Sequence, residues 1–498
     1  MSSAEPKSPR NEHLLILLLC VIAAFRVFIF SAAFPFFSNI DEDLHFDLIT
    51  QYSRAQVPRT FDRLKSETLN WIVPYASPEF LFPPERFPDG KFPAPLWKEP
   101  WSKVEPEISA TRAEWSDEIN FQSSQPPLYY ALASAWWWIG KHLGLGGLQS
   151  LYWIRFLNVL LVATMVWLGY ITARTIAPQR TDVCIGVPLL LAFIPQNVFY
   201  SMNNDVLSPL CFGAFFLCIL RWLRTNTPSL WLGALTGLTL AATCLTKLSN
   251  LPLVAVGLGV IVARSVTINL RTPGVGLIAL AALIVSAAIP VGTWVLWTKF
   301  QFGDFTGSTT KIGLLGWTRK PFGDWWQHPI FTPRGVWTFW SDLLASFWRG
   351  EVSWHGRSLH WRGADGFYAM SSLLVIAAAI VGLGKQTGLS AFQRQAIGSS
   401  ILIFLAGVAF LALLSIQFDF GNCINPSREH PYFTSGRLLS GALIPFAVVY
   451  VYAVSWIFRR INTALPLIVV GLIAVFITTS EILISHSMFA SDHNWFHR

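Results

Sequence analysis

Three consecutive acids, Asp41, Glu42 and Asp43, follow the first long apolar stretch of the sequence, and His45 lies two positions further on. Adjacent carboxylates repel one another, and low-dielectric surroundings at a membrane edge raise their pKa values unless a cation or metal ion is near. A carboxylate in this position can accept a proton as a general base, or bind a metal ion together with His45. A solvated acidic cap on a helix end is the alternative interpretation.

Isolated cations are a second feature that can do chemistry. Lys247 is a lone basic residue between two apolar stretches, and Arg437 comes directly before another, with Arg428 nearby. A cation at a membrane edge is a candidate functional residue. A lipid phosphate is a natural partner, because guanidinium and ammonium groups donate charge-assisted hydrogen bonds to it. The alternatives are a lysine that extends its head group to the interface and an interfacial arginine anchor.

Two further segments are candidates for substrate contact. Asn203-Asn204-Asp205 separates two apolar stretches, although Asn and Asp also commonly form turns and helix caps. Residues 300–365 are rich in tryptophan. These rings either belong to an interfacial belt or stack on sugars: Trp317, Trp325, Trp326, Trp337, Trp340, Trp348, Trp354 and Trp361.

The composition places all of these residues in a membrane protein. Of the 498 residues, 53% are hydrophobic and 13% are charged, whereas a soluble domain carries about 25% charged residues. The apolar residues fall into blocks of roughly 18–25, the length that a helix needs to cross about 30 Å of hydrocarbon. We therefore predict an all-α polytopic membrane protein with apolar blocks near 13–37, 126–143, 150–174, 182–201, 205–223, 229–246, 250–264, 273–299, 366–384, 396–416, 438–458 and 463–485.

The basic residues indicate which block does not cross. If every block crossed, Arg174 and Arg180 would lie on the opposite side from Lys7 and Arg10, against the positive-inside rule. Block 126–143 begins with two prolines and contains three adjacent tryptophans, which is typical of an interfacial helix. Reading it as juxtamembrane leaves about eleven spans with every basic pair in the cytoplasm. These pairs also explain the net charge of +8 without a nucleic-acid partner.

The predicted organisation follows from this topology. The N-terminus is inside, the C-terminus is outside, and the long loops lie on the non-cytoplasmic side. The parts are a cytoplasmic tail with the first transmembrane helix (1–37), a first external loop with the juxtamembrane helix (38–149), transmembrane helices 2–7 (150–299), a Trp-rich external loop (300–365), and transmembrane helices 8–11 with an external loop at 417–437 (366–498).

The order of several motifs resembles the GT-C glycosyltransferase superfamily, which includes protein O-mannosyltransferases and the bacterial aminoarabinose transferase of lipid A. Within it, the likeness is to a large family of bacterial predicted membrane proteins, and it covers about residues 25–440. Arg437 is followed by Leu438, where that family continues with Tyr and Pro. The motifs are Asp41-Glu42-Asp43, Pro126-Pro127-Leu128-Tyr129-Tyr130, Arg155, Pro195, Asn203-Asn204-Asp205, Lys247, Ser346-Phe347-Trp348 and Ser435-Gly436-Arg437.

The resemblance implies sugar transfer from a polyprenyl-phosphate carrier to a lipid, glycan or protein acceptor, with inversion at the anomeric carbon. It also implies a bacterial inner membrane and a site that faces the periplasm or exterior. An acid among Asp41, Glu42 and Asp43 would be the general base. Other residues would bind substrate or phosphate: His45, Arg155, Asp205, Lys247, Trp348 and Arg437. A divalent metal, Mg²⁺ or Mn²⁺, would have Asp41, Asp43, His45 and Asp205 as its candidate ligands.

Other classes of function remain open at this point. A transporter or flippase of lipid-linked or small polar substrates would show inverted repeats and helices broken near the midplane. A glycan polymerase or ligase of another fold would share the carrier lipid but not the acids after the first helix. A channel or structural protein leaves those acids unexplained.

Overall fold

The computed structural model describes residues 10–38, 40–385 and 388–497. Lys7 and Asn39 therefore lie outside the described residues. The described chain is α-helical, with short 3-10 turns and four two-residue strands. The helices of the first third are α1 (Arg10–Ala33), α2 (Glu42–Tyr52), α3 (Ser66–Tyr75), α4 (Trp101–Trp115), α5 (Leu128–His142), α6 (Gly147–Ile176) and α7 (Thr181–Phe193).

The rest of the chain continues in the same way. Its helices are α8 (Ser208–Arg224), α9 (Leu230–Thr246), α10 (Leu251–Arg271), α11 (Leu277–Phe302), α12 (Ser308–Leu314), α13 (Pro333–Arg349), α14 (Arg362–Lys385), α15 (Ala391–Gln417), α16 (Leu443–Phe458) and α17 (Leu465–Phe489). The strands pair as two small antiparallel ladders, β1 (Thr318–Arg319) with β4 (Phe418–Asp419) and β2 (Ser353–Trp354) with β3 (Arg357–Ser358).

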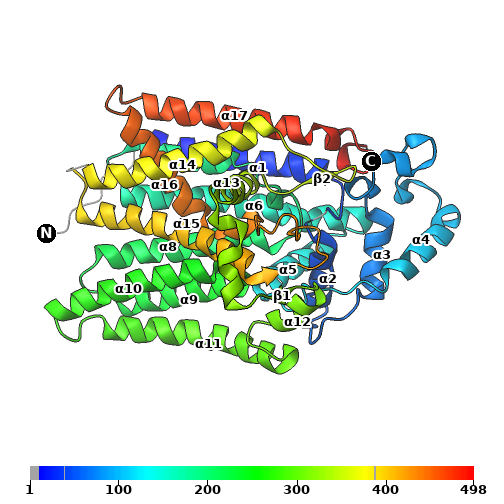
Figure 1. The fold of residues 1–498 in the computed structure, drawn as a ribbon, viewed down its shortest axis with the longest axis horizontal. Helices are drawn as coiled ribbons and strands as arrows, with labels where there is room; N and C mark the ends of the chain where they lie inside the picture. Colours follow the sequence, from blue (N-terminus) through cyan, green and yellow to red (C-terminus); the bar gives the residue numbers. More distant parts are fainter. Residues whose placement is uncertain (1–9, 39, 386–387, 498) are drawn as a thin grey trace.

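Long apolar helices lie side by side along the longest axis of the molecule (Figure 1). Within the described ranges, nine helices are long and apolar enough to cross a membrane, and α7 and α9 are shorter apolar helices. Together they correspond to the eleven predicted spans, which confirms the prediction of an all-α polytopic membrane protein. The predicted short span at 250–264 is wrong in length, because α10 extends to Arg271.

Helix α7 ends earlier than the apolar pattern predicts. The block at 182–201 suggested a full span, but the helix stops at Phe193. Pro195 follows, and a proline disfavours the helical conformation of the residue before it. The chain then turns through the short 3-10 helices η5 (Asn197–Tyr200) and η6 (Asn204–Leu207) before α8 begins.

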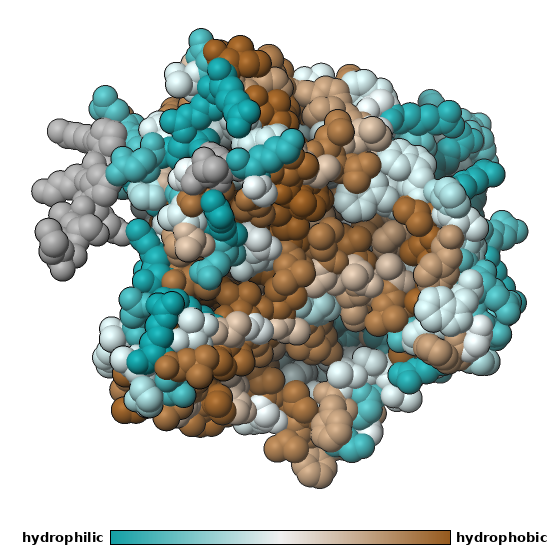
Figure 2. All heavy atoms as spheres, turned by 60° about the vertical axis from the view of Figure 1, so that its left-hand side comes forward, coloured by the Kyte–Doolittle hydropathy of each residue, from teal (hydrophilic) through white to brown (hydrophobic). Residues whose placement is uncertain are grey.

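The outer surface of the helix bundle is apolar. Figure 2 shows hydrophobic side chains gathered in a broad central region, with hydrophilic residues towards both ends. Helix α11 contributes exposed side chains such as Leu277, Ile284 and Ile289. Side chains of this kind are stable against lipid, since a bilayer provides the apolar surroundings that water does not.

Inside the bundle, charged residues are paired. Arg26 of α1 forms an ion pair with Glu481 of α17 at 2.8 Å, and it also donates to the hydroxyl of Tyr200 at 2.6 Å. A buried ion left without its partner is costly. The pair therefore specifies how the first and last spans meet around the turn that follows α7.

The first external loop forms helices α2, α3, α4 and α5, which cluster beyond one end of the long helices (Figure 1). Helix α5 falls within the predicted juxtamembrane block and is 15 residues long. At 1.5 Å per residue it reaches about 22 Å, less than the hydrocarbon thickness. Its position at the interface and the inside-outside assignment of the loops stay predictions.

Candidate functional site

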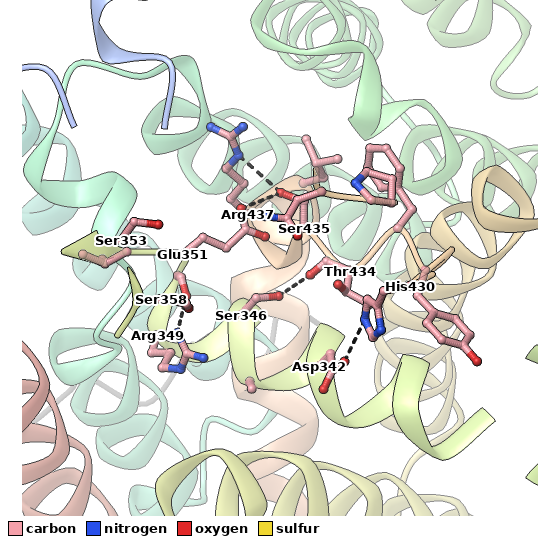
Figure 3. Close-up of a pocket in the computed structure, with 18 of the residues that line it drawn as sticks. Asp342, Ser346, Arg349, Glu351, Ser353, Ser358, His430, Thr434, Ser435 and Arg437 are labelled. Atoms are coloured by element: carbon pink, nitrogen blue, oxygen red, sulfur yellow. Dashed lines mark hydrogen bonds and ion pairs between the residues drawn. The ribbon is translucent and has the colours of Figure 1, made fainter. Parts of the chain in front are cut away.

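A cavity of about 890 Å³ opens where the first external loop meets the Trp-rich segment and the chain before α16 (Figure 3). Its volume is in the range of ligand-binding clefts. Helix α13 supplies one wall: Trp337, Ser341, Ala345 and Arg349 line the cavity, and their spacing of four places them on one helix face. Charged and polar lining residues from other segments include Asp41, His45, Gln122, Gln125, Lys247, Lys311, Glu351, His430, Ser435 and Arg437.

Asp41 and Arg437 meet in this cavity. Arg437 Nη2 lies 2.9 Å from Asp41 Oδ2, and its Nη1 donates to the carbonyl of Ile40 at 3.1 Å. Asp41 precedes α2 in the left-handed conformation, with φ of 62°, which Asp tolerates better than most residues. Burial by itself would raise the pKa of Asp41, but the positive charges of Arg437 and Lys311 outweigh it and hold the pKa below its ordinary value.

Lys247 and Asp205 form a second ion pair. Lys247 Nζ lies 2.5 Å from Asp205 Oδ1, and Asp205 is fully buried. Lys247 stands at the break between α9 and α10, in extended backbone, so its ammonium points out of both helices and lines the cavity. The structure thus brings together Asp41, Lys247 and Arg437, three residues that the sequence places more than 180 positions apart.

Lys311 is a third cation in the cavity, and sequence reasoning missed it. Its Nζ donates to Gln122 Oε1 at 3.0 Å, while Gln122 Nε2 donates to Asp41 Oδ2 at 3.1 Å. Burial lowers the pKa of Lys311 to about 8, with Asp41 acting in the opposite direction. A lysine within an aromatic-rich segment was the available signal. No signal in the sequence indicated a role for Gln122, which lies shortly before the Pro-Pro motif.

His45 lies beside the acidic motif but carries no charge. Its Nδ1 is 2.7 Å from the hydroxyl of Tyr130, the second tyrosine of the Pro-Pro-Leu-Tyr-Tyr motif. Burial lowers the pKa of His45 well below its ordinary value, and the nearby Lys247 and Arg437 add to this although Asp41 opposes it. His45 therefore enters the cavity as a neutral hydrogen-bonding group.

Glu42 and Arg155 pair away from the cavity. Both side chains are fully buried, with Arg155 Nη2 at 2.6 Å from Glu42 Oε2 and Arg155 Nε at 2.7 Å from Oε1. The carboxylate also accepts from the backbone N–H groups of Phe37, Ser38 and Met202. Five donors leave Glu42 no lone pair for a reacting proton. This pair joins α1, α2 and α6 at the base of the site.

Two other candidates also face elsewhere. Asp43 does not line the cavity. Burial raises its pKa to about 8, and the negative charges of Glu118 and Asp41 add to this shift. Trp348 lies in the core, where its ring stacks on Tyr368 at 5.2 Å and its Nε1 donates to Ser372 Oγ at 2.9 Å. Trp348 stabilises α13 against α14 and does not present a platform to a sugar.

The metal ligands suggested by the sequence do not form a metal site. Within the part of the chain that the structure describes, no three or more His, Cys, Asp or Glu side chains gather in a way that could hold a metal ion. Asp41 and Asp205 each pair with a cation instead. A divalent metal at these residues stays a prediction from the sequence.

The motifs Ser346-Phe347-Trp348 and Ser435-Gly436-Arg437 contact each other directly. Ser346 Oγ accepts from the backbone N–H of Gly436 at 2.9 Å and donates to the carbonyl of Thr434. A Cβ on Gly436 would collide with the backbone of Phe347. The close approach requires glycine and fixes Arg437 against the C-terminal end of α13.

Comparison with known proteins gives one family match. A family model described as "Predicted membrane protein (DUF2142)" matches residues 24–422. A search of curated proteins finds no match.

Among solved structures, the Archaeoglobus fulgidus oligosaccharyltransferase in complex with Zn and sulfate matches with a TM-score of 0.43 and 12% identity, over 95% of this chain and 53% of that chain. The oligosaccharyltransferase AglB from the same organism, in complex with an inhibitory peptide and a dolichol-phosphate, matches with 0.39 and 13%, over 97% and 56%. ArnT from Cupriavidus metallidurans, bound to undecaprenyl phosphate, matches with 0.33 and 14%, over 90% and 78%.

These proteins are GT-C glycosyltransferases, the superfamily that the sequence motifs resemble. The chain spans about half the length of the two oligosaccharyltransferases. All three TM-scores are below 0.5, so the likeness assigns neither substrate nor mechanism to this chain.

Proposed function

We propose that this chain, which belongs to the family of predicted membrane proteins described as DUF2142, is a multi-pass membrane glycosyltransferase that moves a sugar from a polyprenyl-phosphate carrier to an acceptor hydroxyl. One observation carries the proposal: a single cavity is lined by Asp41 and by several cations, among them Lys247, Lys311 and Arg437. Sugar transfer from a lipid phosphate needs this combination, a base for the acceptor proton and positive charge for the leaving phosphate.

The cations suit a phosphate in number and position. Lys247 and Arg437 each neutralise one carboxylate in the ligand-free site, and Lys311 donates to a neutral amide. A phosphate that enters among them gives Lys311 a charged partner in place of the amide, and adds a second anionic partner for Lys247 and Arg437. As the bond to the sugar breaks, negative charge grows on the phosphate oxygen, and cations already in place stabilise it without reorganisation.

Asp41 is the base in this proposal, because it is the first-loop acid that lines the cavity. The acceptor oxygen attacks the anomeric carbon, the bond from that carbon to the phosphate oxygen breaks, and the acceptor proton passes to Asp41. A single in-line displacement inverts the anomeric configuration. A bound phosphate also attracts Arg437 away from Asp41, which raises the basicity of the carboxylate when the donor is present.

The acceptor and the location belong to the same proposal. The acceptor is a lipid, glycan or protein hydroxyl that enters from the non-cytoplasmic side, where the topology predicted from the basic loops puts the cavity. The membrane is the bacterial inner membrane, and the cavity faces the periplasm.

Native mass spectrometry of the detergent-purified protein tests the proposal. The wild type should retain a polyprenyl phosphate, and a Lys311→Gln, Arg437→Gln double variant should lose it. Lys247 is left unchanged because its removal would leave buried Asp205 unpaired, which destabilises a fold. The matched control is Lys320→Gln, Arg428→Gln, since Lys320 is partly exposed, Arg428 is exposed, and both lie outside the cavity. Equal lipid retention in the two double variants would contradict the proposed site.

A further inference from the structure

A second carboxylate, Glu351, is linked to Arg437 through the hydroxyl of Ser435. Glu351 follows the C-terminal end of α13 and lines the cavity. Its Oε2 accepts from Ser435 Oγ at 3.1 Å, and Ser435 Oγ in turn accepts from Arg437 Nε at 3.4 Å. Figure 3 shows Glu351, Ser435 and Arg437 close together. Arg437 therefore contacts Asp41 through Nη2 and is linked to Glu351 through Nε and Ser435.

The backbone of Glu351 is held rigidly. Asn197 Nδ2 donates to the Glu351 carbonyl at 2.7 Å, and the Glu351 N–H donates to Asn197 Oδ1 at 3.3 Å. Gly350 has φ of 79°, and a Cβ there would collide with Asn197 and Gln196. Rigid support of this kind is typical of side chains that must meet a ligand in a defined geometry.

One oxygen of Glu351 is left for a ligand. Oε2 is used by Ser435, whereas Oε1 accepts none of the hydrogen bonds found among the described residues. Burial raises the pKa of Glu351, although Arg437 and Ser435 oppose the shift. A carboxylate that has lost much of its water and keeps an open acceptor gains from any hydroxyl that binds there.

We propose that Glu351 is a specificity-determining residue that accepts a hydrogen bond, through Oε1, from a hydroxyl of the sugar on the lipid-phosphate donor. This inference rests on the proposed function. A phosphate bound to Arg437 carries the sugar one bond away from it, so the sugar lies between Asp41 and Glu351. Asp41 serves the acceptor, whereas Glu351 recognises the donor. Sites that hydrogen bond a substrate hydroxyl discriminate strongly against analogues that lack it.

The test measures two forms of the carrier in the same native mass spectra. Glu351→Gln should reduce the sugar-bearing carrier about tenfold or more, as expected for a lost hydrogen bond to a charged group. Retention of free carrier, measured by adding undecaprenyl phosphate, should stay within about twofold, because Arg437 and Lys311 are intact. Asp324→Asn, an exposed acid of the same loop outside the cavity, should change neither.

Two results for Glu351→Gln would overturn the proposal. An unchanged sugar-bearing fraction in Glu351→Gln overturns the proposal. Accumulation of the sugar-bearing carrier, which we expect for Asp41→Asn, would show that Glu351 acts on the acceptor and would also overturn it. A wild type without any polyprenyl phosphate contradicts the proposed function itself. If melting shows that Glu351→Gln is misfolded, Glu351→Asp replaces it and should reduce the sugar-bearing fraction while keeping the charge.

Discussion

Residue scale. The adjacent acids Asp41 and Glu42 have opposite energetic roles. Glu42 is fully buried with Arg155, and it also accepts from three backbone N–H groups, of Phe37, Ser38 and Met202. Asp41 keeps 22% of its side chain exposed beside Arg437. Loss of one partner of a buried pair leaves an uncompensated charge, whereas a partly exposed pair contributes little to stability.

We therefore expect Glu42→Gln to reduce the free energy of unfolding by about 3–5 kcal/mol, and Asp41→Asn to change it by about 1 kcal/mol or less. Asp41→Asn should instead reduce sugar transfer about 10²–10⁴-fold. Thermal melting in detergent measures the first effect, and a transfer assay in membranes measures the second. A well-folded Asp41→Asn with full activity would exclude Asp41 as the base.

Binding of undecaprenyl phosphate should weaken as the pH rises through about 8. The pKa of Lys311 is about 8 in the ligand-free protein, so the ammonium is charged below that pH and neutral above it. The pKa of Asp43 is also about 8, and its ionisation adds negative charge over the same range. Both changes disfavour binding of the negatively charged phosphate. The second ionisation of the phosphate, near pH 6, is already complete.

Two variants separate these contributions. Affinity is measured from pH 7.5 to 9.5 for the wild type, Lys311→Arg and Asp43→Asn. Lys311→Arg should remove most of the decrease, because arginine stays charged throughout. Asp43→Asn should remove the smaller part, since Asp43 does not line the cavity. A wild-type affinity that is constant over this range would show that Lys311 does not contact the phosphate.

Element scale. Helix α13 positions the site through both of its faces. Leu343, Phe347 and Trp348 are buried in the bundle, while Trp337, Ser341 and Arg349 line the cavity. This amphipathic pattern with a period near 3.6 can be read from the sequence. The sequence does not show which segment the polar face contacts, because its partner, residues 434–437, comes almost 90 positions later.

The close approach between α13 and that segment gives a prediction. Gly436→Ala should displace Arg437 from Asp41, because the added Cβ would meet the backbone of Phe347, which cannot rotate away. We expect loss of carrier retention in native mass spectra and a modest decrease in melting temperature. Gly471→Ala is the control, since a Cβ there meets nothing within 4 Å. Normal carrier retention in Gly436→Ala would show that this contact does not position Arg437.

Whole-molecule scale. Helix α1 begins at one end of the helix bundle and α17 ends at the other (Figure 1), as an odd number of crossings requires. The described helices include nine long apolar ones and the shorter α7 and α9. Helix α5, between α1 and α6, is the element whose position decides the orientation of everything after it, because one extra crossing would reverse every later loop.

A cysteine at His142, the exposed last residue of α5, should react with an impermeant thiol reagent added from outside. Gly144 is the neighbouring alternative, but its φ of 82° would strain a cysteine. The background variant is Cys423→Ser, since Cys423 lines the cavity and the other five cysteines lie in helices of the bundle. Reaction only after permeabilisation would show that α5 crosses the membrane and would reverse the predicted topology.

The sequence by itself determined the class of the molecule and the number of its apolar helices. Both depend on block length and composition, which the thickness of a bilayer constrains directly. It also singled out Lys247 and Arg437 as candidates, since an isolated charge in apolar surroundings is visible without any contact information. The family match over residues 24–422 likewise depends on the sequence alone.

Only the tertiary structure decided which acid faces the cavity. Successive helical residues point about 100° apart, so Glu42 and Asp43 turn away once α2 begins, whereas Asp41 remains outside the helix in a left-handed conformation. Lys311 lies in the short helix α12, and Glu351 follows the end of α13. Their positions depend on contacts with Gln122, Asn197 and Ser435, which are distant in sequence and carry no periodic signal.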